Sequence, residues 1–193
     1  MDFGIAITPT AAAGDVAARA EALGFSPIWF DDTQLLCHDI LVAMTAAALK
    51  TSRSKLCAGV LVPSNPLAAV AANALASLNA LAPGRVIAGL GTGYTARRTM
   101  GLPAQKLDDI REYARVMRAL WRGERVETAI EGNRHKIQFM HPPHIGRRLR
   151  QHGRCHTGPS VGVRAERPAI GRRHRRRLHQ SLDRSGSAGR YPQ

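Results

Sequence analysis

The chain has few cysteines and no long apolar segment. Cys37, Cys57 and Cys155 are its three cysteines, and none forms a CxxC or CxH pattern. This spacing favours reduced thiols over a disulfide framework and predicts no metal site, and we expect Cys57 to be buried and inert. No run reaches the roughly 18 to 20 apolar residues of a membrane span, and the start lacks the features of a signal peptide. We therefore expect a cytoplasmic protein.

Basic residues are in excess, but mainly at one end of the chain. Of the net charge of +14, the part through Pro142 accounts for little, with 15 Lys and Arg against 12 acidic residues. Residues 143–193 hold 13 Arg, no Lys and 2 acidic residues. Most of the net positive charge therefore lies in the last quarter of the chain. Residues 1–142 have the ordinary balance of basic and acidic residues of a globular enzyme.

Residues 143–193 also lack Phe, Trp, Met and Asn, and they contain no apolar run longer than two residues. Such a segment buries too little apolar surface to offset its chain entropy, so we expect disorder. Three interpretations remain open: a frame-shifted terminus, an inert extension, or a tail that binds nucleic acid through arginine. The abrupt change in composition favours the first, and only Tyr191 offers a base-stacking surface.

Residues 1–142 alternate between short apolar runs and helical patterns. The predicted buried strands are Phe3–Thr8, Pro27–Asp31, Leu56–Val62 and Arg85–Gly91. The third is apolar throughout, as a strand covered on both faces of a parallel sheet must be. Helical patterns follow each run, the last at Leu107–Arg122, and a hairpin of Val126–Ile130 with His135–Phe139 comes next. A fifth strand is due within about ten residues, and we find none.

Alternation of strand and helix predicts right-handed parallel crossovers. Two architectures satisfy it, a doubly wound open sheet and a (β/α)₈ barrel. Asp15 is the expected N-cap of the first helix because its carboxylate can accept hydrogen bonds from free N–H groups, and the second helix is expected to begin at Asp39.

Ligands of parallel α/β folds bind where strands end, so the turns after the strands are the candidate site. Asp31 and Asp32 follow the second run, and their side chains should point to opposite sides. The turn of Gly91, Thr92 and Gly93 allows close approach of backbone to a ligand, although it also fits a simple tight turn.

Residues 91–96 match the G-x-G-x-x-A dinucleotide fingerprint, which raises an NAD-dependent Rossmann enzyme as an alternative. The fingerprint belongs after the first strand and directly before a helix. Here it follows the fourth predicted strand, and residues 96–103 are expected to delay the next helix. We therefore rank this alternative third.

Four motifs follow one another along the chain, at Leu23–Asp32, Pro83–Gly93, Leu107–Glu124 and Glu131–Gly132. Together, and in this order, they resemble the luciferase-like monooxygenase family of flavin- and deazaflavin-dependent oxidoreductases. The best likeness is to the coenzyme F-420-dependent branch, which includes methylenetetrahydromethanopterin reductase-like enzymes. It covers residues 1–142 and implies the first four βα units of a TIM-type (β/α)₈ barrel plus a small hairpin.

The resemblance implies a site for deazaflavin coenzyme F-420, with FMN as the alternative. Carried over by motif position, Asp32 approaches the ring or the substrate. Gly59 and Val60 lie at a bulge that often holds a non-prolyl cis peptide, and Gly91, Thr92 and Gly93 line the pocket. Thr33 and Tyr94 depart from the family's pattern, so we assign no catalytic acid.

The implied function is hydride transfer or mono-oxygenation of a small-molecule substrate, with no nucleic-acid or membrane partner and with homodimers among intact relatives. The oxidoreductase class would act on paired donors or on CH–OH and CH–NH groups. The family's phosphate-binding residues lie mainly in the second half of the barrel, so we expect this chain to be truncated and inactive. The leading alternative is a nucleic-acid-binding protein that uses the tail.

Overall fold

The computed structural model describes residues 3–63 and 67–140, and the backbone of 160–163. Its elements in chain order are β1 (Ile5–Ile7), α1 (Ala13–Ala22), β2 (Ile28–Phe30), α2 (Ile40–Lys50), β3 (Leu56–Leu61), α3 (Ala68–Leu81), β4 (Val86–Leu90), α4 (Tyr94–Thr99), α5 (Leu107–Trp121), β5 (Val126–Ile130), β6 (Asn133–Ile137) and β7 (Ser160–Val163).

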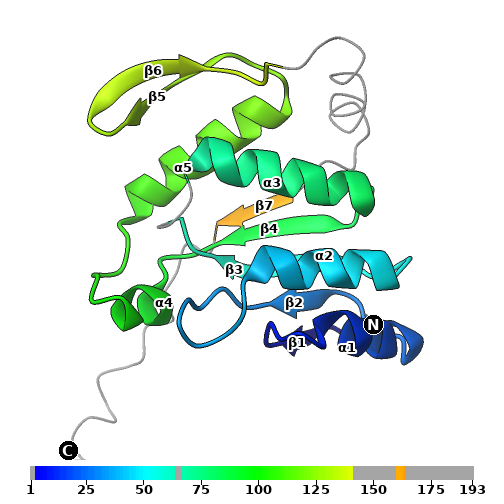
Figure 1. Ribbon diagram of the computed structural model, residues 1–193. Helices are drawn as coiled ribbons and strands as arrows, with labels where there is room; N and C mark the ends of the chain where they lie inside the picture. The colour runs from blue at the N-terminus through cyan, green and yellow to red at the C-terminus, as the bar shows by residue number, and fades with distance from the viewer. Residues whose placement is uncertain (1–2, 64–66, 141–159, 164–193) are drawn as a thin grey trace, which may run out of the picture.

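The strands pair in parallel in the order β1-β2-β3-β4-β7 (Figure 1). Each strand therefore lies beside the next parallel strand in the chain. This order contradicts the doubly wound alternative, in which the strand order reverses about the first strand. The predicted α/β class with a parallel sheet is confirmed. Within the described residues β1 and β7 are the edges of an open sheet.

The core lies between the sheet and a layer of helices, in which α1 packs on α2, α2 on α3 and α3 on α5. Alternate side chains of the strands face this layer, and Ile28, Phe30, Leu56 and Leu90 are fully buried there. On the other face of the sheet the strands carry small or partly exposed side chains, such as the half-buried Trp29.

The fifth parallel strand corrects the sequence analysis. We expected no strand beyond the hairpin, yet Ser160–Val163 pairs with Ile87–Leu90. A search for runs of apolar residues misses this segment because it is only four residues long and includes Gly162. Its two valines are nevertheless typical of a strand. The rest of the expected disordered tail, with its frame-shifted, inert and nucleic-acid-binding interpretations, lies outside the described residues.

The predicted hairpin is confirmed as the antiparallel pair β5–β6, with the second strand beginning two residues earlier than expected. Glu131 and Gly132 form its two-residue turn with φ values of 51° and 81°. Positive φ at both positions is the geometry that matches the twist of a short hairpin.

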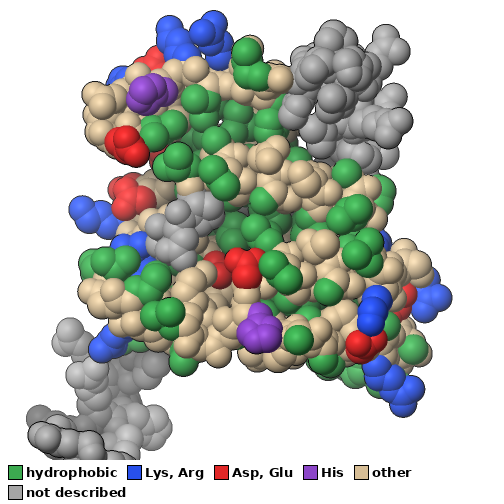
Figure 2. All heavy atoms as spheres, viewed as in Figure 1, with side chains coloured by type: hydrophobic (Ala, Val, Ile, Leu, Met, Phe, Trp, Pro, Cys, Tyr) green, Lys and Arg blue, Asp and Glu red, His purple; other side chains and the backbone are tan. Residues whose placement is uncertain are grey.

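The outer side of the helical layer carries exposed apolar side chains (Figure 2). Val42 and Leu49 of α2 are 68% and 69% exposed, and Val70 of α3 is 55% exposed. Surfaces of this kind suit a partner protein. The homodimer expected of intact relatives stays a prediction. Among the described residues, no helix is long and apolar enough to span a membrane.

Candidate functional site

The candidate site lies where β2, β3 and β4 end. Parallel strands bring their carboxyl ends to one edge of the sheet, so the residues after them gather there. Asp32 follows β2, Val62 follows β3 and Gly91 follows β4. A hydrogen bond of 3.2 Å from the Gly91 N–H to the Leu61 carbonyl joins the last two ends. The structure thus brings the predicted residues to one rim.

Asp32 is the buried carboxylate of this rim, with 8% of its surface exposed. One of its oxygens accepts a hydrogen bond of 2.8 Å from the Val62 N–H, and the other accepts one from the Gln34 amide. Burial raises the pKa of Asp32 above its ordinary value, against the effect of these two hydrogen bonds. The rim therefore holds a desolvated acid that is fixed to the end of β3.

The carboxylates of Asp31 and Asp32 have different partners. Asp31 faces the next loop, where its carboxylate lies 3.5 Å from the Cys37 thiol. That thiol also donates to the Thr33 carbonyl at 3.2 Å, and burial raises its pKa. The two neighbouring acids accordingly do not form an acid–base pair.

The peptide bond between Gly59 and Val60 is cis, and the pairing of β3 with β4 shifts between Gly59 and Leu61. The resemblance predicted both features at these residues. A Cβ built on Gly59 would lie 2.7 Å from Cε3 of Trp29, so that ring leaves no room for a side chain. Gly59 itself is exposed, so the rim presents backbone without a side chain at this position.

The glycines after β4 make room for the side chains of Val60 in β3 and of Val62 just after it. A Cβ on Gly91 would lie 2.5 Å from Cγ2 of Val60, and one on Gly93 would lie 2.3 Å from Cγ1 of Val62. Gly93 also has a φ of 66°, which L side chains rarely adopt. These contacts account for both glycines without a ligand, and whether the turn also binds one stays a prediction.

A short helix, α4, begins directly after this turn, with Gly93 as its N-cap residue. The expectation that residues 96–103 delay the helix is therefore wrong. Residues Tyr94–Thr99 lack the apolar spacing of a buried helix, and only Ala96 of them is buried. The NAD alternative gains nothing from this correction, because the strand order still excludes the Rossmann topology.

Two rim residues escaped the sequence analysis. Gln105 donates from its side-chain amide to the Pro63 carbonyl at 2.7 Å and from its backbone to the Thr92 carbonyl at 2.9 Å. Tyr113 of α5 is 9% exposed, and burial together with the charge of Asp32 raises its pKa. Gln105 belongs to no recognisable sequence motif, so nothing in the sequence indicated its role. The position of Tyr113 on the apolar face of α5 could have indicated its burial.

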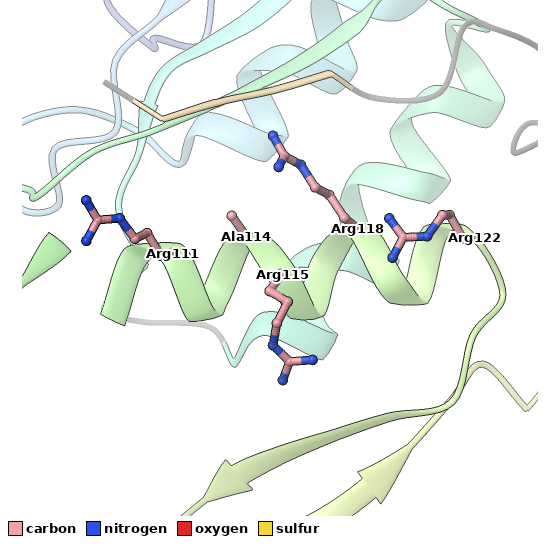
Figure 3. Close-up of a pocket in the computed structure, with 5 residues that line it drawn as sticks. All are labelled: Arg111, Ala114, Arg115, Arg118 and Arg122. Atoms are coloured by element: carbon pink, nitrogen blue, oxygen red, sulfur yellow. The ribbon is translucent and has the colours of Figure 1, made fainter. Parts of the chain in front are cut away.

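A row of arginines forms a separate groove on α5 (Figure 3). Its lining residues are Arg111, Ala114, Arg115, Arg118 and Arg122. Arg111 pairs with Asp108 at 2.6 Å, Arg115 with Glu112 at 2.7 Å and Arg122 with Glu124 at 2.5 Å. This neighbouring negative charge makes the groove a poor anion site. Within the described residues, no cluster of three metal-ligating side chains occurs.

Comparisons with known proteins give a consistent result. The chain is 38% identical over 127 residues to an F-420-dependent glucose-6-phosphate dehydrogenase of Kineococcus radiotolerans, covering 58% of this chain and 37% of that protein. It is 34% identical over 131 residues to a 5,10-methylenetetrahydromethanopterin reductase of Methanolobus tindarius, covering 65% and 40%. The chain thus spans well under half the length of these relatives.

A solved structure with a similar fold is the coenzyme F-420-dependent tetrahydromethanopterin reductase of Methanopyrus kandleri. It superposes with a TM-score of 0.61 at 26% identity, over 69% of this chain and 44% of that chain. The luciferase-like monooxygenase family model matches residues 4–170, which extends past the boundary at residue 142 that the motifs indicated. The chain belongs to the luciferase-like monooxygenase family.

Proposed function

We propose that the chain supplies one side of a (β/α)₈ barrel mouth, and that the rim formed by β2, β3 and β4 binds the ring of deazaflavin coenzyme F-420 for hydride transfer. The observation that carries this proposal is the meeting of three features at the end of β3. They are the buried Asp32, the cis bond before Val60 and the glycine turn at Gly91.

The residues present fit a flat ring with polar edges. Gly59 offers exposed backbone without a side chain, and Thr92 is half-buried in the turn after β4.

When bound, the deazaflavin supplies a ring carbon that accepts or donates hydride, and FMN is the alternative carrier. The chain's own residues would orient that ring against a small-molecule substrate. Val60 and Gly59 would support one face, and the turn from Gly91 to Gly93 would border an edge. Asp32 would hold its proton or charge beside the ring in a place from which water is largely excluded.

One relative is named for glucose-6-phosphate and another for methylenetetrahydromethanopterin. Both names support a small, soluble molecule as the substrate of this chain. We propose no choice between them, because the chain covers 37% and 40% of those proteins. Strands β1 and β7 remain open edges in the described part, so we propose that the chain alone binds the ring weakly and does not turn over substrate.

The test is a titration of the full chain, labelled with ¹⁵N, with coenzyme F-420 and with FMN up to millimolar concentration. Amide signals of Val60, Thr92 and Gly93 should shift saturably and more for F-420 than for FMN. Asp32→Leu should abolish the shifts, while Asp15→Leu, an exposed control in the first turn of α1, should not. Absence of any shift at millimolar cofactor refutes the proposed site. Micromolar binding refutes the claim that the chain alone is a weak half-site.

A further inference from the structure

Gln34 lies in the loop after β2, two residues beyond the buried Asp32. The backbone closes a turn around it, because the N–H groups of Leu36 and Cys37 both donate to the Thr33 carbonyl, at 3.2 and 3.1 Å. From this turn Nε2 of Gln34 donates to Oδ1 of Asp32. A carboxylate only accepts hydrogen bonds, so the amide atom that faces it must be the nitrogen. The turn therefore holds one donor against the acid.

The Asp32 carboxylate has a second donor on its other oxygen. The Val62 N–H, just after β3, donates to Oδ2 at 2.8 Å. The two donors bind different oxygens and come from segments about thirty residues apart in the chain. Together they fix the rotation of the carboxylate about its Cβ–Cγ bond, while each oxygen can still accept one further hydrogen bond.

The electrostatic surroundings of Asp32 favour its neutral form. Burial raises the pKa of Asp32, and the charges of Asp39 and Asp31 raise it further. The charge of Asp32 in turn raises the pKa values of the Cys37 thiol and of the Tyr113 hydroxyl on α5, which burial raises most. Against all of these, the two hydrogen bonds on the carboxylate lower its pKa. The side-chain amide is one of these two supports of the charge.

We propose that Gln34 is a positioning residue for Asp32, whose carboxylate it holds in the ionised form and in one orientation beside the bound ring. This inference rests on the proposed function, in which Asp32 borders the ring. Gln34 does not touch ring or substrate, since its other amide atom, Oε1, is buried. It acts through the acid alone.

A first test needs no variant. In the full chain, labelled with ¹³C and ¹⁵N, the Asp32 carboxyl carbon and the Gln34 side-chain amide should titrate with one midpoint, because a hydrogen bond to an ionised acceptor weakens when that acceptor is protonated. The amide of Gln105 is the internal control. It is a half-buried glutamine of the same rim that donates to the Pro63 carbonyl at 2.7 Å, so it should not respond at that midpoint. A Gln34 amide that ignores the titration of Asp32 overturns the inference.

Variants measure the size of the effect. Gln34→Met removes the donor and nearly keeps the length of the side chain, so the midpoint of Asp32 should rise by about one pH unit, a tenfold change in its proton equilibrium. Gln34→Glu places a second acid beside Asp32 and should raise the midpoint further. Gln105→Met is the matched control and should leave it unchanged. No rise in either Gln34 variant, or an equal rise in Gln105→Met, contradicts the assigned role.

Binding of a ring supplies the functional readout. The probe is 5-deazariboflavin, which carries the ring without the phosphate group of FMN. Its affinity, measured from the amide shifts of Val60 and Thr92, should fall as the pH falls through the Asp32 midpoint. In Gln34→Met this profile should move up by the same pH interval as the midpoint, and a profile that stays in place overturns the inference. If neither 5-deazariboflavin nor F-420 binds at any pH, the proposed function fails, while the titration of the free chain still decides the role of Gln34.

Discussion

Arg85 should be the largest single contributor to stability among the charged side chains of the family motif. Its guanidinium donates from Nη1 to the Thr51 hydroxyl at 2.9 Å and to the Ser54 carbonyl at 3.2 Å. Nη2 donates to the carbonyls of Ala48 and Thr51 at 3.2 and 3.0 Å. The side chain just before β4 thereby satisfies the last carbonyls of α2 and ties them to the loop before β3.

Arg85→Met should lower the free energy of unfolding by about 3 kcal/mol, because hydrogen bonds to a charged group contribute about 1.5 to 3 kcal/mol and four of them share one group. Arg85→Lys should cost about 2 kcal/mol, since a single ammonium cannot reproduce the planar fork. Burial lowers the pKa of Arg85 while Glu21 raises it.

Urea denaturation followed by circular dichroism measures these losses as a shift in midpoint at constant slope. The control is Arg53→Met, an exposed arginine in the adjacent loop, which should change stability by less than about 0.5 kcal/mol. If Arg85→Met costs no more than Arg53→Met, the four hydrogen bonds do not carry the assigned role and the reasoning is wrong.

Three further outcomes are expected. Burial raises the pKa of Glu21, but hydrogen bonds from the backbone of residues 52–54 outweigh it and lower that pKa from 4.5 to about 2. Glu21→Gln should therefore cost about 1 to 2 kcal/mol at pH 7, and urea midpoints should show this difference shrinking as pH falls from 5 to 2. Burial raises the pKa of the Cys57 thiol to about 12, so mass spectrometry should find it unlabelled by maleimide in the folded chain, after Cys37 has reacted. Gly93→Ala should cost at least about 2 kcal/mol, more than Gly101→Ala, because both have positive φ but only the former meets a neighbouring side chain; equal thermal shifts would contradict the packing argument.

The parallel sheet could be predicted because its strands are apolar on both faces. Most of their ends could not, since pairing stops up to two residues inside each apolar run, as at Ile5–Ile7 within the predicted Phe3–Thr8. Capping shows the same limit. Asp39 does cap α2 and accepts from two backbone N–H groups, whereas α1 begins at Ala13 and Asp15 instead pairs with Lys50 at 2.5 Å.

At the rim, sequence reasoning found Asp32 and the glycine turn because each follows a strand end. It could not find Gln105, whose contact with Pro63 joins residues 42 positions apart along the chain. No local pattern encodes such a contact, because it depends on how α4 returns the chain to the end of β3.

The glycines beside β3 have a consequence for how the family motif is understood. Gly91 and Val60 occupy one shared volume, as do Gly93 and Val62. A larger residue in the turn after β4 therefore requires a smaller one at the end of β3, and the paired positions should vary together among related chains. A search with the glycine pattern alone would retrieve chains that merely preserve this fit between two strands. Adding the β3 valines and the acid after β2 to the search would select for the rim itself.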